Sequence, residues 1–272
     1  MIAAWFKRFS IVAIALTASQ ASAQPSKLDV QRLTWAGIKI ADENTTVFVD
    51  AMATDIWDGD APEGFHKPEA NTERRYALVT HVRNDHFDAQ GLRDLLGDRG
   101  YVICHEPIAA YIASRGFQVI PVALNESVNR GGFWFTALPA SDGFGDAQVS
   151  WLIVSGDTKI FHGGDTLWHG SFERIGAQYG PLDVAFLPIN GVSVPGPLGA
   201  YSPRVMTPQQ AVDAAKLLRA DVLSPIHFGL TGAPGYVEVD APLSDMNEAA
   251  TDQGVTAVHL KPGQLLSLND AE

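Results

Sequence analysis

The sequence lacks features that several common classes of function require. Its 272 residues include a single cysteine, Cys104, so no internal disulfide can form. Cys104 ends an apolar run typical of a buried strand, where a thiol packs as an inert core residue. Lys and Arg number 19 against 31 Asp and Glu, giving a formal net charge of −12 without a basic cluster. Nucleic acids and anionic membranes attract concentrated positive charge, so we expect neither as a partner.

Several catalytic signatures are missing as well. No Gly-x-Ser-x-Gly pentapeptide occurs, which argues against a serine nucleophile on a sharp turn. Neither Gly-x-Gly-x-x-Gly nor a phosphate-binding loop with a lysine is present. Cysteine catalysis is not favoured, because Cys104 has no obvious base beside it. Metal-assisted hydrolysis, which relies on His and carboxylate side chains, is the class of chemistry that remains.

The N-terminal stretch has the pattern of a secretory signal peptide. A short apolar run follows Lys7 and Arg8, and Ala-Ser-Ala at residues 21–23 offers a small-residue cleavage site. The run is too short to span a bilayer comfortably, although an uncleaved N-terminal anchor is the alternative. We expect removal of residues 1–23, which carry two basic and no acidic residues and would leave a net charge of −14. The remaining residues 24–272 would be periplasmic or secreted, without membrane attachment.

Hydrophobic periodicity predicts one domain in which helices and strands alternate. Leu92, Leu95 and Leu96 have helical spacing, and Thr207 followed by Pro208 is typical of a helix start. No repeat and no Pro- or Ser-rich linker divides the chain. Helices are predicted at residues 89–96, 107–114, 208–218 and 244–253. Strands are predicted at residues 33–40, 45–50, 76–80, 101–104, 117–120, 133–138, 149–154, 158–161, 184–187, 222–226 and 256–260.

Three of the predicted strands end in a loop that carries His or Asp. The strand at 76–80 is followed by His81, Asp85 and His86, the strand at 158–161 leads to Asp165, and the strand at 222–226 ends on His227. Imidazole and carboxylate groups bind divalent metals, and loops held by a rigid scaffold are where sites are usually built. A divalent ion with an open position lowers the pKa of a bound water towards ~7. The pattern therefore predicts a metal site for hydrolysis.

Each of these residues taken alone has a simpler explanation, since a His or Asp after a strand is more often a cap, a turn residue or an ion-pair partner. It is their shared position at strand ends that favours metal binding. The remaining histidines lack this pattern. We interpret His66 and His105 as loop and helix-start residues and His162 and His259 as structural, and His169 is left open.

Several short motifs resemble the metallo-β-lactamase superfamily. They are Thr80-His81-x-Arg83-x-Asp85-His86, Gly164-Asp165-Thr166 and Pro225-Ile226-His227. The similarity is greatest to a branch that resembles ascorbate-6-phosphate lactonases and related metal-dependent hydrolases. This branch has similar Leu-Pro-Ile-Asn-Gly and Met-Thr-Pro-x-x-Ala segments, found here at residues 187–191 and 206–211. The motifs occur in the expected order over nearly the whole chain after residue 23.

The resemblance implies a four-layer αββα sandwich, an α/β fold with metals at one edge between its two sheets. It also implies ligand roles. One metal site would be formed by Asp85, His86, His227 and Asp165, with Asp165 as the bridging carboxylate in the family pattern. Asp85 would in addition orient the attacking water.

The other metal site of the family pattern is incomplete. His81 is present, but Arg83 stands where a second histidine is expected. A guanidinium stays protonated and has no lone pair for a metal. The third histidine is missing near residues 139–142, where Asp142 is the possible substitute. Arg83 would therefore pair with Asp142, or face the substrate and bind its carboxylate or phosphate.

We expect a metal-dependent hydrolase of an ester, lactone, amide or phosphoester, with a mononuclear or atypical binuclear site. Zinc is the expected metal and manganese the alternative, the partner is a small-molecule substrate, and Arg83 and Asn190 would bind it. Two other interpretations stay open: a non-catalytic binding protein on a degenerate scaffold, and a β-lactam hydrolase.

Overall fold

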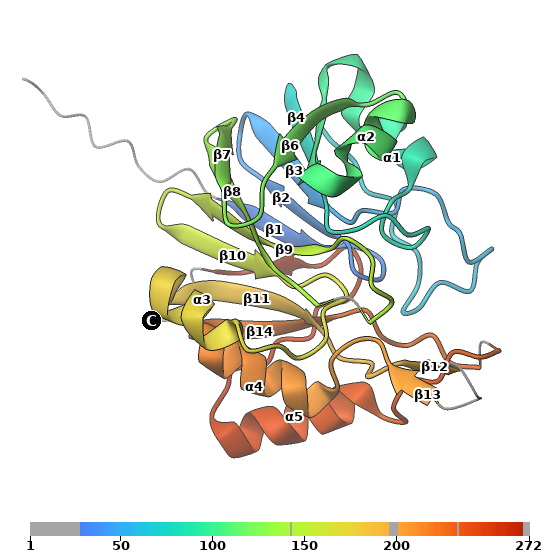
Figure 1. The fold of residues 1–272 in the computed structure, drawn as a ribbon, viewed down its shortest axis with the longest axis vertical. Helices are drawn as coiled ribbons and strands as arrows, with labels where there is room; N and C mark the ends of the chain where they lie inside the picture. The colour runs from blue at the N-terminus through green and yellow to red at the C-terminus, as the bar shows by residue number, and fades with distance from the viewer. Residues whose placement is uncertain (1–27, 142, 196–200, 233, 269–272) are drawn as a thin grey trace, which may run out of the picture.

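The chain folds into two large β-sheets that pack face to face between two groups of helices (Figure 1). The computed structural model describes residues 28–141, 143–195, 201–232 and 234–268. The predicted signal peptide at 1–23 and the possible ligand Asp142 lie outside the described residues. No helix within the described ranges is long and apolar enough to cross a membrane.

The first sheet is mixed. Its strand order is β15 (Leu265–Leu266), β1 (Asp29–Arg32), β2 (Ile38–Ala41), β3 (Thr45–Val49), β4 (Arg74–Val79), β5 (Tyr101–His105) and β6 (Gln118–Val122). The run from β3 to β6 is parallel. All five residues of β3 and the last four of β4 are buried, as expected for parallel strands covered on both faces.

The second sheet is mixed as well. Its order is β14 (Ala220–Ile226), β11 (Leu182–Pro188), β10 (Thr158–His162), β9 (Val149–Ser155), β8 (Phe133–Pro139) and β7 (Ser127–Arg130). Strands β10, β11 and β14 run parallel to one another. A small hairpin of β12 (Ser193–Pro195) and β13 (Tyr201–Pro203) stands apart from both sheets.

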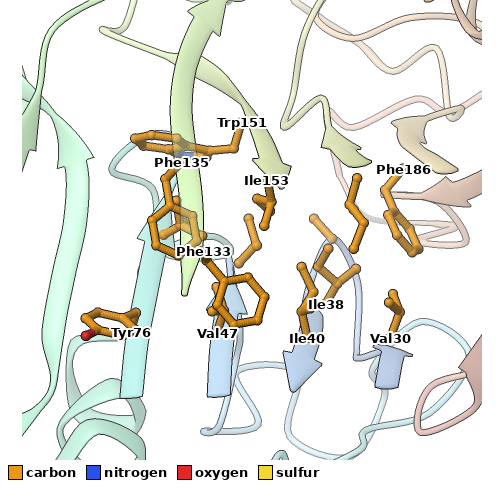
Figure 2. Close-up of a cluster of buried hydrophobic side chains, with 14 of the residues drawn as sticks. Val30, Ile38, Ile40, Val47, Tyr76, Phe133, Phe135, Trp151, Ile153 and Phe186 are labelled. Carbon is orange, nitrogen blue, oxygen red and sulfur yellow. The ribbon is translucent and has the colours of Figure 1, made fainter. Parts of the chain in front are cut away.

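Three apolar clusters hold the layers together. Side chains of the two sheets meet in the central cluster, where Val47 and Ile38 face Phe133 and Phe135 (Figure 2). A second cluster packs the first sheet against α1 (Ala89–Leu96) and α2 (Glu106–Ser114). A third packs the second sheet against α3 (Phe172–Tyr179), α4 (Pro208–Leu218) and α5 (Pro242–Gln253). The predicted four-layer αββα sandwich is thereby confirmed.

Several local predictions are confirmed. Helix α1 begins after Asp88, whose carboxylate caps it, and buries Leu92, Leu95 and Leu96. Helix α4 begins at Pro208 after a capping box formed by Thr207 and Gln210. Cys104 is fully buried in β5, and burial raises the pKa of its thiol to about 12, so the residue is an inert part of the core.

The predicted strand at residues 33–40 is wrong. A tight turn separates β1 from β2, in which the Leu33 N–H donates to the Gly37 carbonyl at 2.8 Å and the Gly37 N–H to the Thr34 carbonyl at 3.0 Å. Trp35 has a left-handed backbone there, with φ of 61°. Residues 33–40 resemble a strand in sequence because most of them are apolar, and Gly37 is the one turn signal among them.

Two further differences concern the second half of the chain. Residues 256–260 form no strand and make a single bridge, from Ala257 to Leu223. Helix α3 was not expected, because it spans only eight residues and contains Gly176. A side chain at Gly176 would collide with the Leu217 carbonyl of α4, so the glycine allows the two helices to pack closely.

The carboxyl ends of the parallel strands from both sheets meet at one edge of the sandwich. β3 and β4 lead to Asp50 and Thr80, while β10 and β14 lead to Asp165 and His227. Two hydrogen bonds join the sheets at this edge: the Val149 N–H donates to the Thr80 carbonyl and the Trp151 indole N–H to the Val79 carbonyl, both at 3.1 Å. Residues distant in sequence thus share one site.

Candidate metal centre

Four predicted ligands come together at this edge of the sandwich. His86 Nε2 lies 3.1 Å from Asp165 Oδ1 and 3.6 Å from Asp85 Oδ2. His227 Nε2 lies 3.0 Å from Asp165 Oδ2 and 3.6 Å from Asp85 Oδ2. Each residue contributes one candidate ligand atom, and the four atoms all lie within 4.8 Å of one another. The residues that were predicted as ligands from their positions after strands are therefore neighbours in space.

The spacing of these atoms suits a divalent ion. An ion with ligands ~2.0–2.1 Å away places neighbouring ligand atoms about 3.3 Å apart, and the nitrogen–oxygen contacts of 3.0–3.6 Å, made to both oxygens of Asp165, lie in that range. His86 Nε2, His227 Nε2 and Asp165 Oδ1 are buried without a hydrogen-bond partner. Buried polar atoms are normally hydrogen-bonded, whereas these three face one another only in ion-pair contacts, and a cation would satisfy all of them. The donor set of two imidazoles and two carboxylates fits such an ion.

The charges within the cluster are coupled. Burial alone would raise the pKa of Asp165, but the facing imidazoles of His227 and His86 hold it well below its ordinary value. Burial alone would lower the pKa of His227, but the Asp165 carboxylate raises it to about 9, and Asp165 and Asp85 likewise raise that of His86. The metal-free centre thus keeps protons between its rings and carboxylates. A bound cation takes the place of those protons, because ligating imidazoles must be neutral.

Asp50, for which the sequence pattern predicted no role, orients two of the histidines. Its fully buried carboxylate receives the His86 Nδ1–H at 2.9 Å and the Thr80 hydroxyl at 2.6 Å. Since the Thr80 proton points to Asp50, the Thr80 oxygen accepts the His81 Nδ1–H at 2.9 Å. In their neutral form both rings then present the Nε2 lone pair to the site, the orientation that outer partners give to metal-binding histidines. The one sequence signal was a carboxylate at the end of the predicted strand 45–50, which in the structure ends at Val49.

His81 lies at the margin of the cluster. Its Nε2 is buried and unpaired but stands 3.9 Å from Asp165 Oδ2, its one ion-pair contact with the four ligands. Burial, reinforced by the neighbouring His86, lowers the pKa of His81 to about 4, so its ring is neutral and able to donate a lone pair. His81 also groups with Asp50 and His86 in a second set of potential ligands, whose members are already joined through Asp50 and Thr80.

Arg83 occupies the position where the family pattern has a histidine, and its guanidinium binds Asp146. Nε and Nη2 donate to Asp146 Oδ2 at 3.0 and 2.6 Å, and the guanidinium carbon lies 3.7 Å from the centroid of the Phe144 ring. Arg204 lies against the same ring at 4.3 Å. Whether Arg83 also pairs with Asp142 stays a prediction, because Asp142 lies outside the described residues.

Asn190, predicted to bind substrate, is fully buried beside the centre. Its amide donates to the Tyr236 hydroxyl at 2.8 Å and to Glu238 Oε1 at 3.0 Å, and its oxygen accepts the Val192 N–H at 3.3 Å. For the Asn190 amide to donate to a substrate, its hydrogen bond to Tyr236 or to Glu238 would have to break. The Tyr236 hydroxyl stays protonated, because burial and then the nearby Asp165 carboxylate raise its pKa.

The other histidines bind protein groups. His162 is buried with Nε2 2.7 Å from the Ala36 carbonyl, and His259 Nε2 lies 2.5 Å from Glu63 Oε1, which agrees with structural roles. His105 Nδ1 lies 3.1 Å from the Val122 carbonyl. His169 stacks on Phe172 with ring centroids 4.0 Å apart, and none of the candidate ligands is its hydrogen-bond partner.

Known proteins resemble this chain over most of its length. A family model described as the beta-lactamase superfamily domain matches residues 45–228. A UPF0173 metal-dependent hydrolase of Pyrococcus abyssi is 31% identical over 215 residues, covering 76% of this chain and 87% of that protein. A protein of the same description from Thermus thermophilus is 27% identical over 249 residues, covering 89% of this chain and 100% of its own.

Solved structures share the fold at lower identity. Igni18, a metallo hydrolase from Ignicoccus hospitalis, superimposes with a TM-score of 0.66 at 19% identity, over 88% of this chain and 97% of its own. CmlA, a diiron β-hydroxylase from Streptomyces venezuelae, gives a TM-score of 0.68 at 18% identity, over 89% of this chain and 54% of its own. Such identities establish the fold alone, and the pair illustrates that one fold hosts different chemistries.

Proposed function

The chain belongs to the β-lactamase superfamily, and we propose that it is a metal-dependent hydrolase with a mononuclear centre formed by Asp85, His86, Asp165 and His227. One observation carries the proposal: two imidazoles and two carboxylates converge with nitrogen–oxygen contacts of 3.0–3.6 Å, and three of the facing atoms are buried without a hydrogen bond. The relatives named metal-dependent hydrolases support the same class of activity.

The two carboxylates of the centre differ in their access to solvent, which suggests separate roles. The Asp165 side chain is 8% exposed and faces both imidazoles, as expected of a purely coordinating group. The Asp85 side chain is 32% exposed, and the facing imidazoles of His86 and His227 hold its pKa below the ordinary value despite burial. An ionised carboxylate at the solvent side can orient an attacking water and take its proton, so Asp85 is the proposed catalytic residue.

A divalent ion at the centre would supply a water of lowered pKa and an electrophile for the scissile carbonyl or phosphoryl oxygen. The mixed nitrogen and oxygen donors favour zinc, with manganese as the alternative. We propose one ion per chain, because Arg83 cannot ligate and His81 stands apart from the four clustered ligands.

The substrate is proposed to be a small ester, lactone, amide or phosphoester with an anionic group. Arg83 would bind that group, since a guanidinium matches the geometry of carboxylate and phosphate. In the structure Asp146 occupies the guanidinium with one carboxylate oxygen, so a substrate carboxylate would compete with it. Arg83 also lines a pocket of about 520 Å³ together with Asn84, Phe87 and Tyr111, although none of the four proposed ligands is among its lining residues.

The closer kinship with ascorbate-6-phosphate lactonases, the periplasmic or secreted location and the assignment of Asn190 to substrate binding stay predictions. So do the rival functions. One rival is a non-catalytic binding protein, which would agree with the absence of two of the three expected ligands at the His81 site. The other is a β-lactam hydrolase, which would agree with the predicted export.

The test of the proposal is hydrolysis of a panel of ester, lactone, phosphoester and β-lactam substrates by the purified protein with zinc or manganese. We expect turnover that a chelator abolishes and that added metal restores. Turnover of β-lactams alone would favour the β-lactam hydrolase. If the protein binds metal but turns over no member of the panel, the binding protein is the better description.

A further inference from the structure

The two histidines of the proposed centre are held in different ways. The His86 Nδ1 atom is bound to the buried Asp50 carboxylate at 2.9 Å. The His227 Nδ1 atom is buried and has no hydrogen-bond partner. Metal-binding imidazoles are usually oriented by a hydrogen bond to the nitrogen that does not face the metal. Something other than such a bond must therefore hold the His227 ring.

Trp35 contacts His227 through both its ring and its main chain. Its indole lies against the imidazole with ring centroids 4.2 Å apart, and its backbone carbonyl accepts the His227 N–H at 3.3 Å. His227 needs that anchor, since its own backbone has an unfavourable φ of 55°. The same tryptophan thus fixes both the ring and the main chain of one candidate ligand.

Trp35 also contacts the proposed catalytic carboxylate. Its indole N–H donates to Asp85 Oδ2 at 3.1 Å, and Oδ2 is the atom that faces the Nε2 atoms of His86 and His227. A donor on this oxygen limits rotation of the carboxylate. Asp85 Oδ2 is thereby kept facing the two imidazoles.

The turn that carries Trp35 is itself anchored. The Arg32 guanidinium donates to the Trp35 carbonyl at 3.3 Å and to Glu63 at 2.6 Å, and the next carbonyl, of Ala36, is bound by His162 at 2.7 Å. Trp35 is 1% exposed and has a left-handed backbone with φ of 61°. A bulky residue in this conformation is uncommon, and strain of this kind is found at functional sites.

We propose that Trp35 is a positioning residue of the centre, which sets the orientation of Asp85 and His227 towards the ion. The inference rests on the proposed metal site and adds to it a residue from the β1–β2 turn, a part of the chain remote from every candidate ligand in sequence. Removal of the indole N–H should weaken metal binding, because outer partners of metal ligands typically contribute 10–100-fold to affinity.

Trp151 provides a matched control within the same chain. It is fully buried like Trp35, and its indole N–H also donates at 3.1 Å, but to the Val79 carbonyl and not to a ligand. The experiment compares the zinc affinity of Trp35→Phe, Trp151→Phe and the unaltered protein by competition with a chromophoric chelator. The free energy of unfolding of each metal-free protein is measured alongside.

We expect Trp35→Phe to lose about 10–100-fold in zinc affinity and Trp151→Phe to keep the affinity of the unaltered protein, with both losing stability. Equal zinc affinity of the two variants would overturn the inference and leave the proposed function intact. Failure of the unaltered protein to take up zinc would overturn both.

A second measurement does not depend on the folding of Trp35→Phe. Indole N–H resonances of the metal-free protein, labelled with ¹⁵N-tryptophan, are compared with those of Asp85→Asn, and Trp151→Phe identifies the Trp151 signal. Replacement of the carboxylate should shift one indole resonance other than that of Trp151, and zinc should shift the same resonance in the unaltered protein. Indole resonances that all stay in place in Asp85→Asn would contradict the hydrogen bond on which the inference depends.

Discussion

The two halves of the loop after β4 make different contacts in the structure. Asp85 and His86 join Asp165 and His227 in a cluster whose contacts measure 3.0–3.6 Å. His81 and Arg83 precede them by a few residues, yet His81 reaches Asp165 at 3.9 Å and Arg83 binds Asp146. Both halves belong to the same loop, so the comparison is between the side chains that they carry.

The two halves can be compared by the groups that hold their side chains in place. In the ligand half the rings and carboxylates have buried supports: Asp50 behind His86, and Trp35 behind Asp85 and His227. In the other half His81 is held as well, by Thr80 and through it by Asp50, but Arg83 carries a permanently charged guanidinium that pairs with Asp146 near the surface. The two halves therefore differ in the side chain at position 83, which cannot ligate a metal, and not in whether their histidines are held.

The largest effect should follow from removal of a clustered ligand. His227→Ala deletes one of two imidazoles and leaves the Asp165 and Asp85 carboxylates facing each other across the gap, so we expect loss of metal retention. The matched control is His105→Ala, which removes an imidazole that binds only the Val122 carbonyl. Elemental analysis after gel filtration measures both. Retention of zinc by His227→Ala would mean that the ligand set is misplaced.

A smaller loss is expected when a support is altered. Asp50→Asn removes the charge that receives the His86 Nδ1–H and should lower metal affinity by about 10–100-fold. Asp88→Asn is the control, since Asp88 is a buried carboxylate that also accepts backbone N–H groups but touches none of the ligands. We expect both variants to lose stability, measured by urea unfolding, and Asp50→Asn alone to lose affinity.

Removal of the metal should destabilise the fold moderately. A ligand at 100 times its dissociation constant adds about 2.7 kcal/mol to the free energy of unfolding, which for a domain of this size corresponds to ~5–10 °C in Tm. Calorimetry of the chelator-treated and zinc-loaded protein measures the shift. The shift should vanish in His227→Ala, and its persistence there would point to zinc bound elsewhere.

The smallest effect on stability is expected in the half that contains Arg83. The Arg83 and Asp146 side chains are 22% and 48% exposed, so Arg83→Gln should cost about 0–1 kcal/mol and leave the metal content unchanged. The variant should lose about 10–100-fold of any preference for anionic over neutral esters, since a hydrogen bond to a charged group contributes about 1.5–3 kcal/mol. Arg115→Gln, on the wall of the pocket that Arg83 also lines, controls for the loss of charge. An unaltered preference in Arg83→Gln would rule out substrate binding by this residue.

Local patterns in the sequence were sufficient for much of the fold and for the clustered residues. Helices α1 and α4 match their predicted bounds because leucine spacing and the Thr207-Pro208 start are local signals. His86, Asp165 and His227 could be selected as candidates because each follows a strand in the region where parallel strands end.

The supports of the centre could not be predicted in this way. Asp50 and His86 are 36 residues apart, Trp35 and Asp85 are 50 apart, and Arg83 and Asp146 are 63 apart. No local periodicity records such pairs, which form only when the two sheets pack. Trp35 was also hidden by its apolar neighbours, which gave the turn the appearance of a strand.

One half of the loop after β4 is proposed to bind a metal, and the other half is proposed not to. The most direct test of this difference is the stoichiometry of zinc binding to the metal-free protein, measured by calorimetric titration and checked by elemental analysis. We predict one equivalent per chain, with the same value in Arg83→Gln. Tight binding of two zinc ions per chain, or of none after reconstitution, would contradict the proposal that only one half of the loop binds a metal.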